Sequence, residues 1–120
     1  MDDAPTSERH FSHAEAVKYI TNALARENVS QSNALSVATA LVNAEIDGQK
    51  GHGFSRVASY ALQARSGKVV GDAVPQARLN GTSMLHIDAA NGFAFPAIDL
   101  AIQRLVPLCE IGRASCRERV

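Results

Sequence analysis

Two serine-capped apolar stripes near the start of the chain constrain its fold more than any other feature. Ser12 opens "SHAE", in which its hydroxyl can accept from the amide of Glu15 while the Glu15 carboxylate returns to the amide of Ser12. Ser30 precedes a second stripe, which Gly48 can end. The stripes recur at helical spacing through Val17, Ile20, Ala23 and Leu24, and then through Ala34, Leu35, Ala38, Leu41, Val42 and Glu45. Two helices joined by a tight turn at Asn28 are therefore expected.

A third helix is expected from about Gly53. It would end where Gly67 can take a positive φ, and its packing residues would be Val57, Tyr60, Ala61 and Ala64. Beyond it, "SMLHIDAANG" alternates so that Leu85 and Ile87 share one face, which predicts a strand; a shorter strand is expected at 77–79. A fourth helix should follow Gly92, with Pro96 in its first position and Ile98, Ala101, Ile102 and Leu105 in its buried stripe.

These elements divide the chain into three parts. Residues 1–68 form a helical amino-terminal segment, residues 69–109 the start of an α/β core, and residues 110–120 a tail. A strand with one apolar face needs neighbours to satisfy its backbone, so the core is expected to be incomplete. The sequence thus predicts an α/β fragment whose helical unit is followed by the first strand or strands and a helix.

The tail "EIGRASCRERV" carries three of the nine arginines and no apolar periodicity. It closely resembles the conceptual translation of a common short-read sequencing adapter, so residues 110–120 are predicted to be foreign to the gene. The alternative is a genuine basic tail that contacts a partner.

Charge and composition narrow the class of function. Twelve basic residues balance twelve acidic ones among 120, so no overall field favours nucleic acid or an anionic membrane. The opening "MDDAPTSERH" lacks the basic start and apolar core of a secretory signal, and no later run is long enough to span a bilayer. Two cysteines have no metal-ligand spacing with a histidine. A cytoplasmic protein without a metal site is expected, and its partner is expected to be a small molecule or another protein.

The segment "GHGFSR", from Gly51 to Arg56, is the strongest candidate for chemistry. A dinucleotide-binding loop would need a preceding strand and a third glycine, whereas here a helix precedes and Arg56 occupies that glycine's place. The phosphate-loop interpretation therefore fails.

His52 and Arg56 offer a different chemistry. If a helix begins near Gly53, residues four apart share a face, and the guanidinium lies beside the imidazole at the positive end of that helix. An arginine can hold a carboxylate by two hydrogen bonds, and an adjacent histidine can move a proton on the neighbouring carbon's oxygen. The pair is typical of a site for a 2-hydroxy or 2-oxo acid. The same residues are also compatible with solvated surface groups.

The sequence also has features of two kinds of non-enzymatic protein. A helix, "ENVSQSN" and a second helix resemble a helix-turn-helix DNA reader, but residues 31–49 contain no lysine or arginine to meet phosphates. A purely structural interaction module is compatible with the composition and predicts that His52→Ala alters only local stability.

A longer pattern resembles a known family. The spans "ALSVATALVNAEIDGQKGHGFSRVASYALQARSGKV" and "IDAANGFAFPAIDLAI" are similar to the amino-terminal part of the type-two malate/L-lactate dehydrogenase family, which also includes sulfolactate, ureidoglycolate, diketogulonate and cyclic-imine reductases. The most specific elements are Asp47, Gly48, His52, Gly53, Arg56 and Tyr60.

The resemblance implies a non-Rossmann fold, usually in homodimers, that uses NAD or NADP to interconvert 2-hydroxy and 2-oxo acids or related imines. It assigns proton transfer to His52 and the substrate carboxylate to Arg56. Many relatives place a serine before the histidine where this chain has Gly51, which leaves the substrate open. It also implies that the main cofactor segments and further site residues lie beyond this stretch, so that these 120 residues alone would be inactive.

Overall fold

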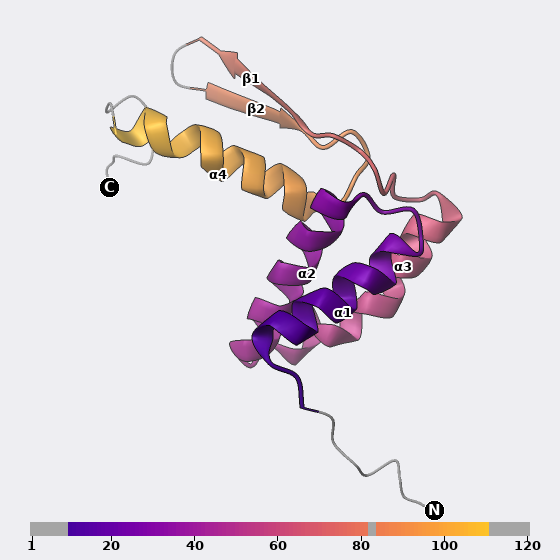
Figure 1. Ribbon diagram of the computed structural model, residues 1–120. Helices are drawn as coiled ribbons and strands as arrows, with labels where there is room; N and C mark the ends of the chain where they lie inside the picture. Colours follow the sequence, from indigo (N-terminus) through magenta and orange to yellow (C-terminus); the bar gives the residue numbers. More distant parts are fainter. Residues whose placement is uncertain (1–9, 82–83, 111–120) are drawn as a thin grey trace, which may run out of the picture.

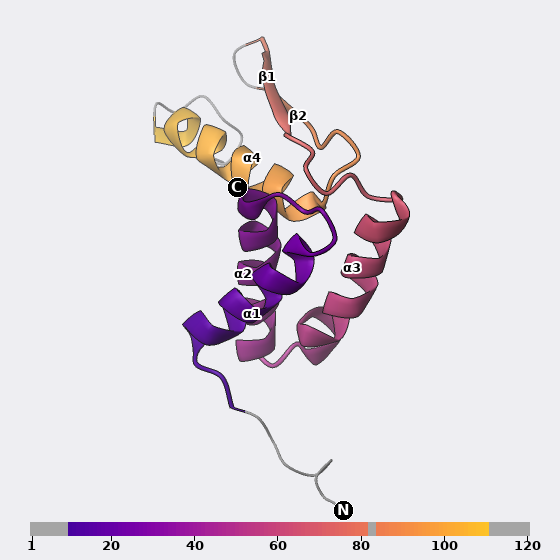
Figure 2. The same ribbon diagram turned by 45° about the vertical axis from the view of Figure 1, so that its right-hand side comes forward.

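The computed structural model describes residues 10–81 and 84–110 (Figure 1). Within these ranges the helices are α1 (His13–Ala25), α2 (Gln31–Ile46), α3 (Val57–Ser66) and α4 (Ala94–Glu110). Two 3-10 turns, η2 (Lys50–His52) and η3 (Phe54–Arg56), separate α2 from α3, and the strands β1 (Gln76–Asn80) and β2 (Met84–Asp88) precede α4. Figures 1 and 2 show α1, α2 and α3 grouped together, with the strands and α4 extending from one end of that group. The α/β class is confirmed.

The first helix begins as the sequence predicts. The Ser12 hydroxyl accepts from the Glu15 amide at 3.1 Å, and the Ser12 amide donates to the Glu15 carboxylate at 2.8 Å, so the capping box is complete. The helix ends at Ala25, and Asn28 takes a φ of 66° in the turn that follows. Two of the four backbone amides that have no intrahelical acceptor at this helix start are thus hydrogen-bonded within residues 12–15.

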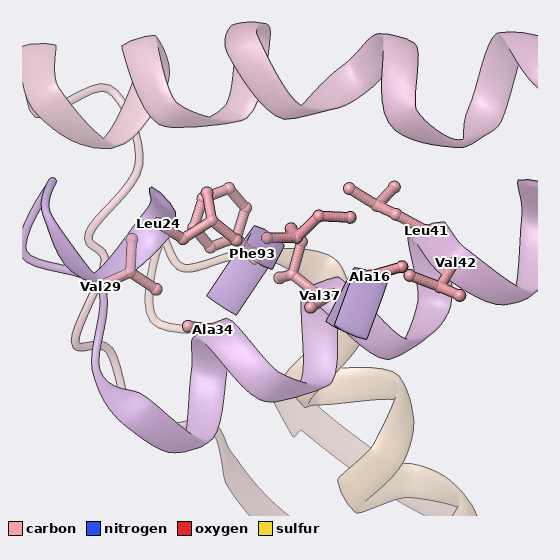
Figure 3. Packing of buried hydrophobic residues seen from close by; sticks show 10 residues of the cluster. Ala16, Leu24, Val29, Ala34, Val37, Leu41, Val42 and Phe93 are labelled. Atoms are coloured by element: carbon pink, nitrogen blue, oxygen red, sulfur yellow. The ribbon is translucent and has the colours of Figure 1, made fainter. Parts of the chain in front are cut away.

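The second helix provides half of the buried hydrophobic cluster. Ser30 caps it, and Gly48 follows its end with a φ of 84°. Its apolar stripe packs on α1, and Phe93, from the turn before α4, lies against the same cluster (Figure 3). The largest fully buried side chains are Ile20, Leu24, Val37 and Leu41.

The prediction that Leu35 belongs to the buried stripe of α2 is wrong. Leu35 is 49% exposed and borders an open hollow between α1 and α2, whereas Val37, absent from the predicted stripe, is fully buried. Several apolar positions on α2 fit helical spacing, and the elements that pack on it decide which of them are covered.

A buried asparagine joins α2 to the segment that leads into the strands. The side-chain amide of Asn33 donates to the carbonyl of Gly71 at 2.9 Å and to that of Ala73 at 2.8 Å, and the Ser30 amide also donates to Gly71. Gly71 permits this approach, because a Cβ there would lie 2.7 Å from the carbonyl oxygen of Asn28. The start of α2 therefore fixes where the chain leaves the helical unit.

The two strands form an antiparallel hairpin. Ala77 pairs with Ile87 and Leu79 with Leu85, which confirms the predicted face shared by Leu85 and Ile87. Those two residues are half-buried, while their neighbours in β2 are exposed.

The fourth helix departs from the sequence prediction in two ways. It begins at Ala94, so Pro96 occupies the third position, still within the first turn where an amide has no intrahelical acceptor. Ile98 and Ile102, predicted to be buried, are 49% and 55% exposed. The hairpin and the start of α2 contact α4, and no further described element covers these two side chains. The helix continues to Glu110; the rest of the predicted foreign tail lies outside the described residues, so that assignment stays a prediction.

An ion pair joins the carboxyl-terminal ends of α1 and α3. Arg65 donates from Nε and Nη2 to the two carboxylate oxygens of Glu27, at 3.0 and 2.7 Å. These hydrogen bonds, assisted by the positive charge, lower the pKa of the Glu27 carboxyl below its usual range.

We expect Asn33→Ala to lower the free energy of unfolding by about 1–3 kcal/mol, because the buried Ala73 carbonyl would lose its donor. Urea unfolding of the 120-residue chain measures the change. Asn22→Ala, at an exposed position of α1, is the control and should change stability by at most about 0.5 kcal/mol. Equal effects of the two substitutions would contradict the bridging role of Asn33.

The Glu27–Arg65 pair predicts a pH dependence. Because the folded carboxyl has a lowered pKa, its contribution to stability is present above the unfolded value of about 4.3 and is lost as the pH falls through the folded value. The stability difference between the native chain and Arg65→Met should therefore shrink in acid. The free energy of unfolding of Glu27→Gln, which lacks the titrating group, should approach that of the native chain over the same pH range. A difference that stays constant from pH 7 to pH 2.5 would exclude this linkage.

Candidate functional site

The segment predicted to carry chemistry is a pair of short turns and not the start of a helix. His52 ends η2, Arg56 ends η3, and the α-helical conformation begins only at Val57. The prediction of a helix from Gly53, with His52 and Arg56 on one helical face, is therefore wrong. The predicted end is correct, since Gly67 follows α3 with a φ of 83°.

Glu45, in the last turn of α2, accounts for this geometry. Its Oε1 accepts from the Phe54 amide at 2.9 Å, and its side chain lies directly against Gly53. A Cβ at Gly53 would be 3.0 Å from the Glu45 Cβ and closer still to the carboxylate. The other carboxylate oxygen is 3.6 Å from the Lys50 ammonium. The carboxylate thus accepts from an amide that, in a helix starting at Gly53, would lie in the first turn and have no intrahelical acceptor.

The loop is also closed by its own side chains. Arg56 folds back so that its Nε donates to the carbonyl of Gly51 at 2.8 Å, and the Ser55 hydroxyl donates to the carbonyl of Lys50 at 2.8 Å. The backbone amides of His52 and Arg56 donate to the carbonyls of Gln49 and Gly53, each at 2.9 Å. These bonds keep the guanidinium beside the residue that precedes His52.

The Arg56 side chain is therefore held against the backbone that precedes His52, by a different route from the predicted helical face. Both side chains are exposed, and the imidazole makes no hydrogen bond to another described residue. The Arg56 terminal nitrogens likewise have no protein partner within the described ranges, because only Nε is engaged. The two terminal nitrogens thus remain able to donate hydrogen bonds to an anion.

An open hollow of about 240 Å³ adjoins this loop. Glu45 and Phe54 form part of its wall, together with His10, Phe11, Ser12, His13, Ala16, Val42 and Ile46. Neither His52 nor Arg56 lines it. The hollow is next to the loop but does not include the candidate catalytic pair.

The other polar residues have local structural roles. His13 shares a hydrogen bond with Asn43 at 3.2 Å, and Asp88 accepts from the Ala90 amide at 2.9 Å. No group of three His, Cys, Asp or Glu side chains within residues 10–81 and 84–110 is arranged to hold a metal ion. In the same ranges no helix has the length and apolar character needed to cross a membrane.

Glu45 is the functional candidate that sequence reasoning missed. In the sequence, Glu45 continues the apolar stripe of α2. In the structure, its side chain is only 22% exposed. A carboxylate that continues an apolar stripe is itself a signal, because a partly buried charge requires donors nearby. The sequence could not identify those donors, since one is a backbone amide nine residues away.

The fold of the chain matches that of known structures. The chain superposes with a TM-score of 0.80 on Δ1-piperideine-2-carboxylate reductase from Pseudomonas syringae, at 29% identity over 84% of this chain and 30% of that one. It superposes with a TM-score of 0.78 on a malate dehydrogenase from Pyrococcus horikoshii, at 21% identity over 87% of this chain and 30% of that one, which indicates the fold alone. The fold is therefore that of the amino-terminal part of these dehydrogenases.

The sequence comparisons define the family. The malate/L-lactate dehydrogenase family profile matches residues 11–115, and the chain belongs to this family. It is 43% identical over 105 residues to a (2R)-3-sulfolactate dehydrogenase (NADP⁺) from Chromohalobacter salexigens, covering 87% of this chain and 31% of the relative. It is 30% identical over 106 residues to a Δ1-pyrroline-2-carboxylate reductase from Ancylobacter novellus, covering 88% and 31%. The chain thus spans about a third of the length of these relatives.

The two glycines that flank His52 should respond differently to a methyl group. Gly53→Ala would press on Glu45 and is expected to lower the free energy of unfolding by about 1–3 kcal/mol. Gly51→Ala is the matched control, because no atom lies within 4 Å of the position its Cβ would take, and it should cause no loss. Urea unfolding of both variants measures the difference. A Gly51 variant as unstable as the Gly53 variant would show that Glu45 does not impose the constraint.

Proposed function

We propose that the protein carrying this chain is an NAD(P)-dependent oxidoreductase that interconverts a 2-hydroxy acid and a 2-oxo acid. One observation carries the proposal: the Arg56 guanidinium is held on the carbonyl before His52, with its terminal nitrogens directed to no protein partner among the described residues. Membership of the malate/L-lactate dehydrogenase family supports the reaction class, and the named NADP⁺ relative supports the cofactor class.

The pair has a defined role for each residue. The Arg56 terminal nitrogens hold the substrate carboxylate, which fixes the neighbouring carbon. During oxidation, His52 accepts the hydroxyl proton as the C–O bond becomes a carbonyl; in reduction it returns that proton. A bound nicotinamide supplies the chemistry of hydride transfer to or from that carbon. We assign none of the described residues to nicotinamide binding.

A cyclic imine carboxylate is the second candidate substrate. The relatives that are named as pyrroline and piperideine carboxylate reductases favour it. Such a substrate presents the same carboxylate to Arg56, while His52 would exchange a proton with the ring nitrogen instead of an oxygen. Gly51 leaves room for different groups here, because the space around its α-carbon is open.

The assembly and location are further parts of the proposal. A homodimer follows from the family resemblance, and a cytoplasmic location follows from the composition; both stay predictions. Size-exclusion chromatography with light scattering and cell fractionation would test them on the full-length protein.

In the full-length protein, His52→Ala should lower kcat by about a hundredfold or more, because a positioned proton-transfer group is lost. Arg56→Ala should mainly raise KM for the acid substrate. Stopped-flow assays with NADH and NADPH against 2-oxo acids and cyclic imines measure both effects. His86→Ala, an exposed histidine of β2, is the control and should leave both parameters unchanged. Native kinetics in the His52 and Arg56 variants would instead favour the non-catalytic interaction module.

A further inference from the structure

We infer that Glu45 is a positioning residue for this site, and that its role is to supply a hydrogen-bond acceptor and not a charge. The inference rests on the proposed function, because it assigns Glu45 to the orientation of His52 for proton transfer. Glu45 belongs to α2, whereas the histidine belongs to the loop that follows, so the contact links the packed core to the reacting group.

The contacts of Glu45 fall on the two residues that come directly after His52. Its side chain lies against Gly53, and its Oε1 accepts from the Phe54 amide at 2.9 Å. On the other side of His52, the Gly51 carbonyl accepts from Arg56 Nε at 2.8 Å. The backbone that carries the imidazole is therefore held on both sides, once by α2 and once by the arginine that would bind the substrate.

The hydrogen bond from the Phe54 amide holds the loop more firmly than the ion pair with Lys50. The Lys50 side chain is 83% exposed and its ammonium is 3.6 Å from Glu45, so this pair is screened by water and holds the loop weakly. The Phe54 bond joins a backbone amide to a side chain that is only 22% exposed. An amide oxygen in the same place could also accept that bond, whereas the thioether sulfur of methionine, of similar length, is only a weak acceptor.

Loss of the acceptor would release the turn without removing any group that contacts substrate. Displacement of a catalytic group by about 1 Å can cost as much as a hundredfold in rate. Glu45→Met should therefore lower kcat more than it raises KM, because the proton-transfer step needs the His52 geometry most. Glu45→Gln should retain the acceptor and rescue the rate.

The kinetic test compares Glu45→Met and Glu45→Gln in the full-length protein. We expect kcat to fall about tenfold or more in the Met variant, with KM within about threefold of native, and to stay within about threefold of native in the Gln variant. Glu27→Met is the matched control: it also removes a hydrogen-bonded carboxylate, but from the far end of α1, and it should leave kcat unchanged. Native kcat in Glu45→Met, or equal losses in the Met and Gln variants, would overturn the inference.

A second measurement needs no turnover. In the 120-residue chain, the Phe54 amide should exchange with solvent about tenfold or more faster in Glu45→Met than in the native and Gln variants, as expected on loss of a hydrogen bond worth about 1.4 kcal/mol. The His52 ring resonances should shift in the Met variant only. Unchanged exchange would overturn the contact itself. Altered exchange with native kcat would overturn the positioning role but not the enzyme. An inactive native protein with the expected exchange would overturn the proposed function, and with it any catalytic role for Glu45.

Discussion

The burial of α1 against α2 is the constraint on which the rest of the structure depends. The largest fully buried side chains are Ile20 and Leu24 on α1 and Val37 and Leu41 on α2. The position of α2 is therefore fixed by the packing of its central residues. Both ends of α2 then act on other parts of the chain. Asn33, near the start, holds the segment that leads into the strands, and Glu45, near the end, holds the loop with His52. One packed helix therefore relates the α/β elements to the candidate site.

The conformation of the loop that carries His52 depends on two close contacts of its backbone, and not on helix geometry. Gly53 brings the loop against Glu45, and Arg56 returns to the carbonyl of Gly51. Both contacts join the loop to groups that are near in sequence, so its conformation needs only α2 in place. The residues proposed to act on substrate are therefore different from those that hold the loop in place. The imidazole and the terminal guanidinium nitrogens stay exposed, while the bonds that orient them involve backbone atoms and a half-buried carboxylate.

The sequence predicted the features that depend on local chemistry. The Ser12 capping box and the glycines at 48 and 67 were identified correctly, because a cap and a positive φ are properties of a few adjacent residues. The two 3-10 turns were missed, because they depend on a carboxylate from a different element. Leu35, Ile98 and Ile102 were assigned to buried stripes for a related reason: helical spacing says which residues share a face, and only tertiary packing says whether that face is covered.

The exposure of the pair affects how it could act on a small acid. A guanidinium–carboxylate contact in open water gains little free energy, since both ions lose hydration and the attraction is screened. A second contribution comes from the fixed orientation of the donor. A donor that is already held in place loses less conformational entropy when the anion binds. Arg56 is held in this way by the Gly51 carbonyl, and the loop by Glu45. In the proposed site, the main contribution of these residues would therefore be to align the substrate carboxylate with the imidazole, and exclusion of water by substrate and cofactor would strengthen the charge interaction.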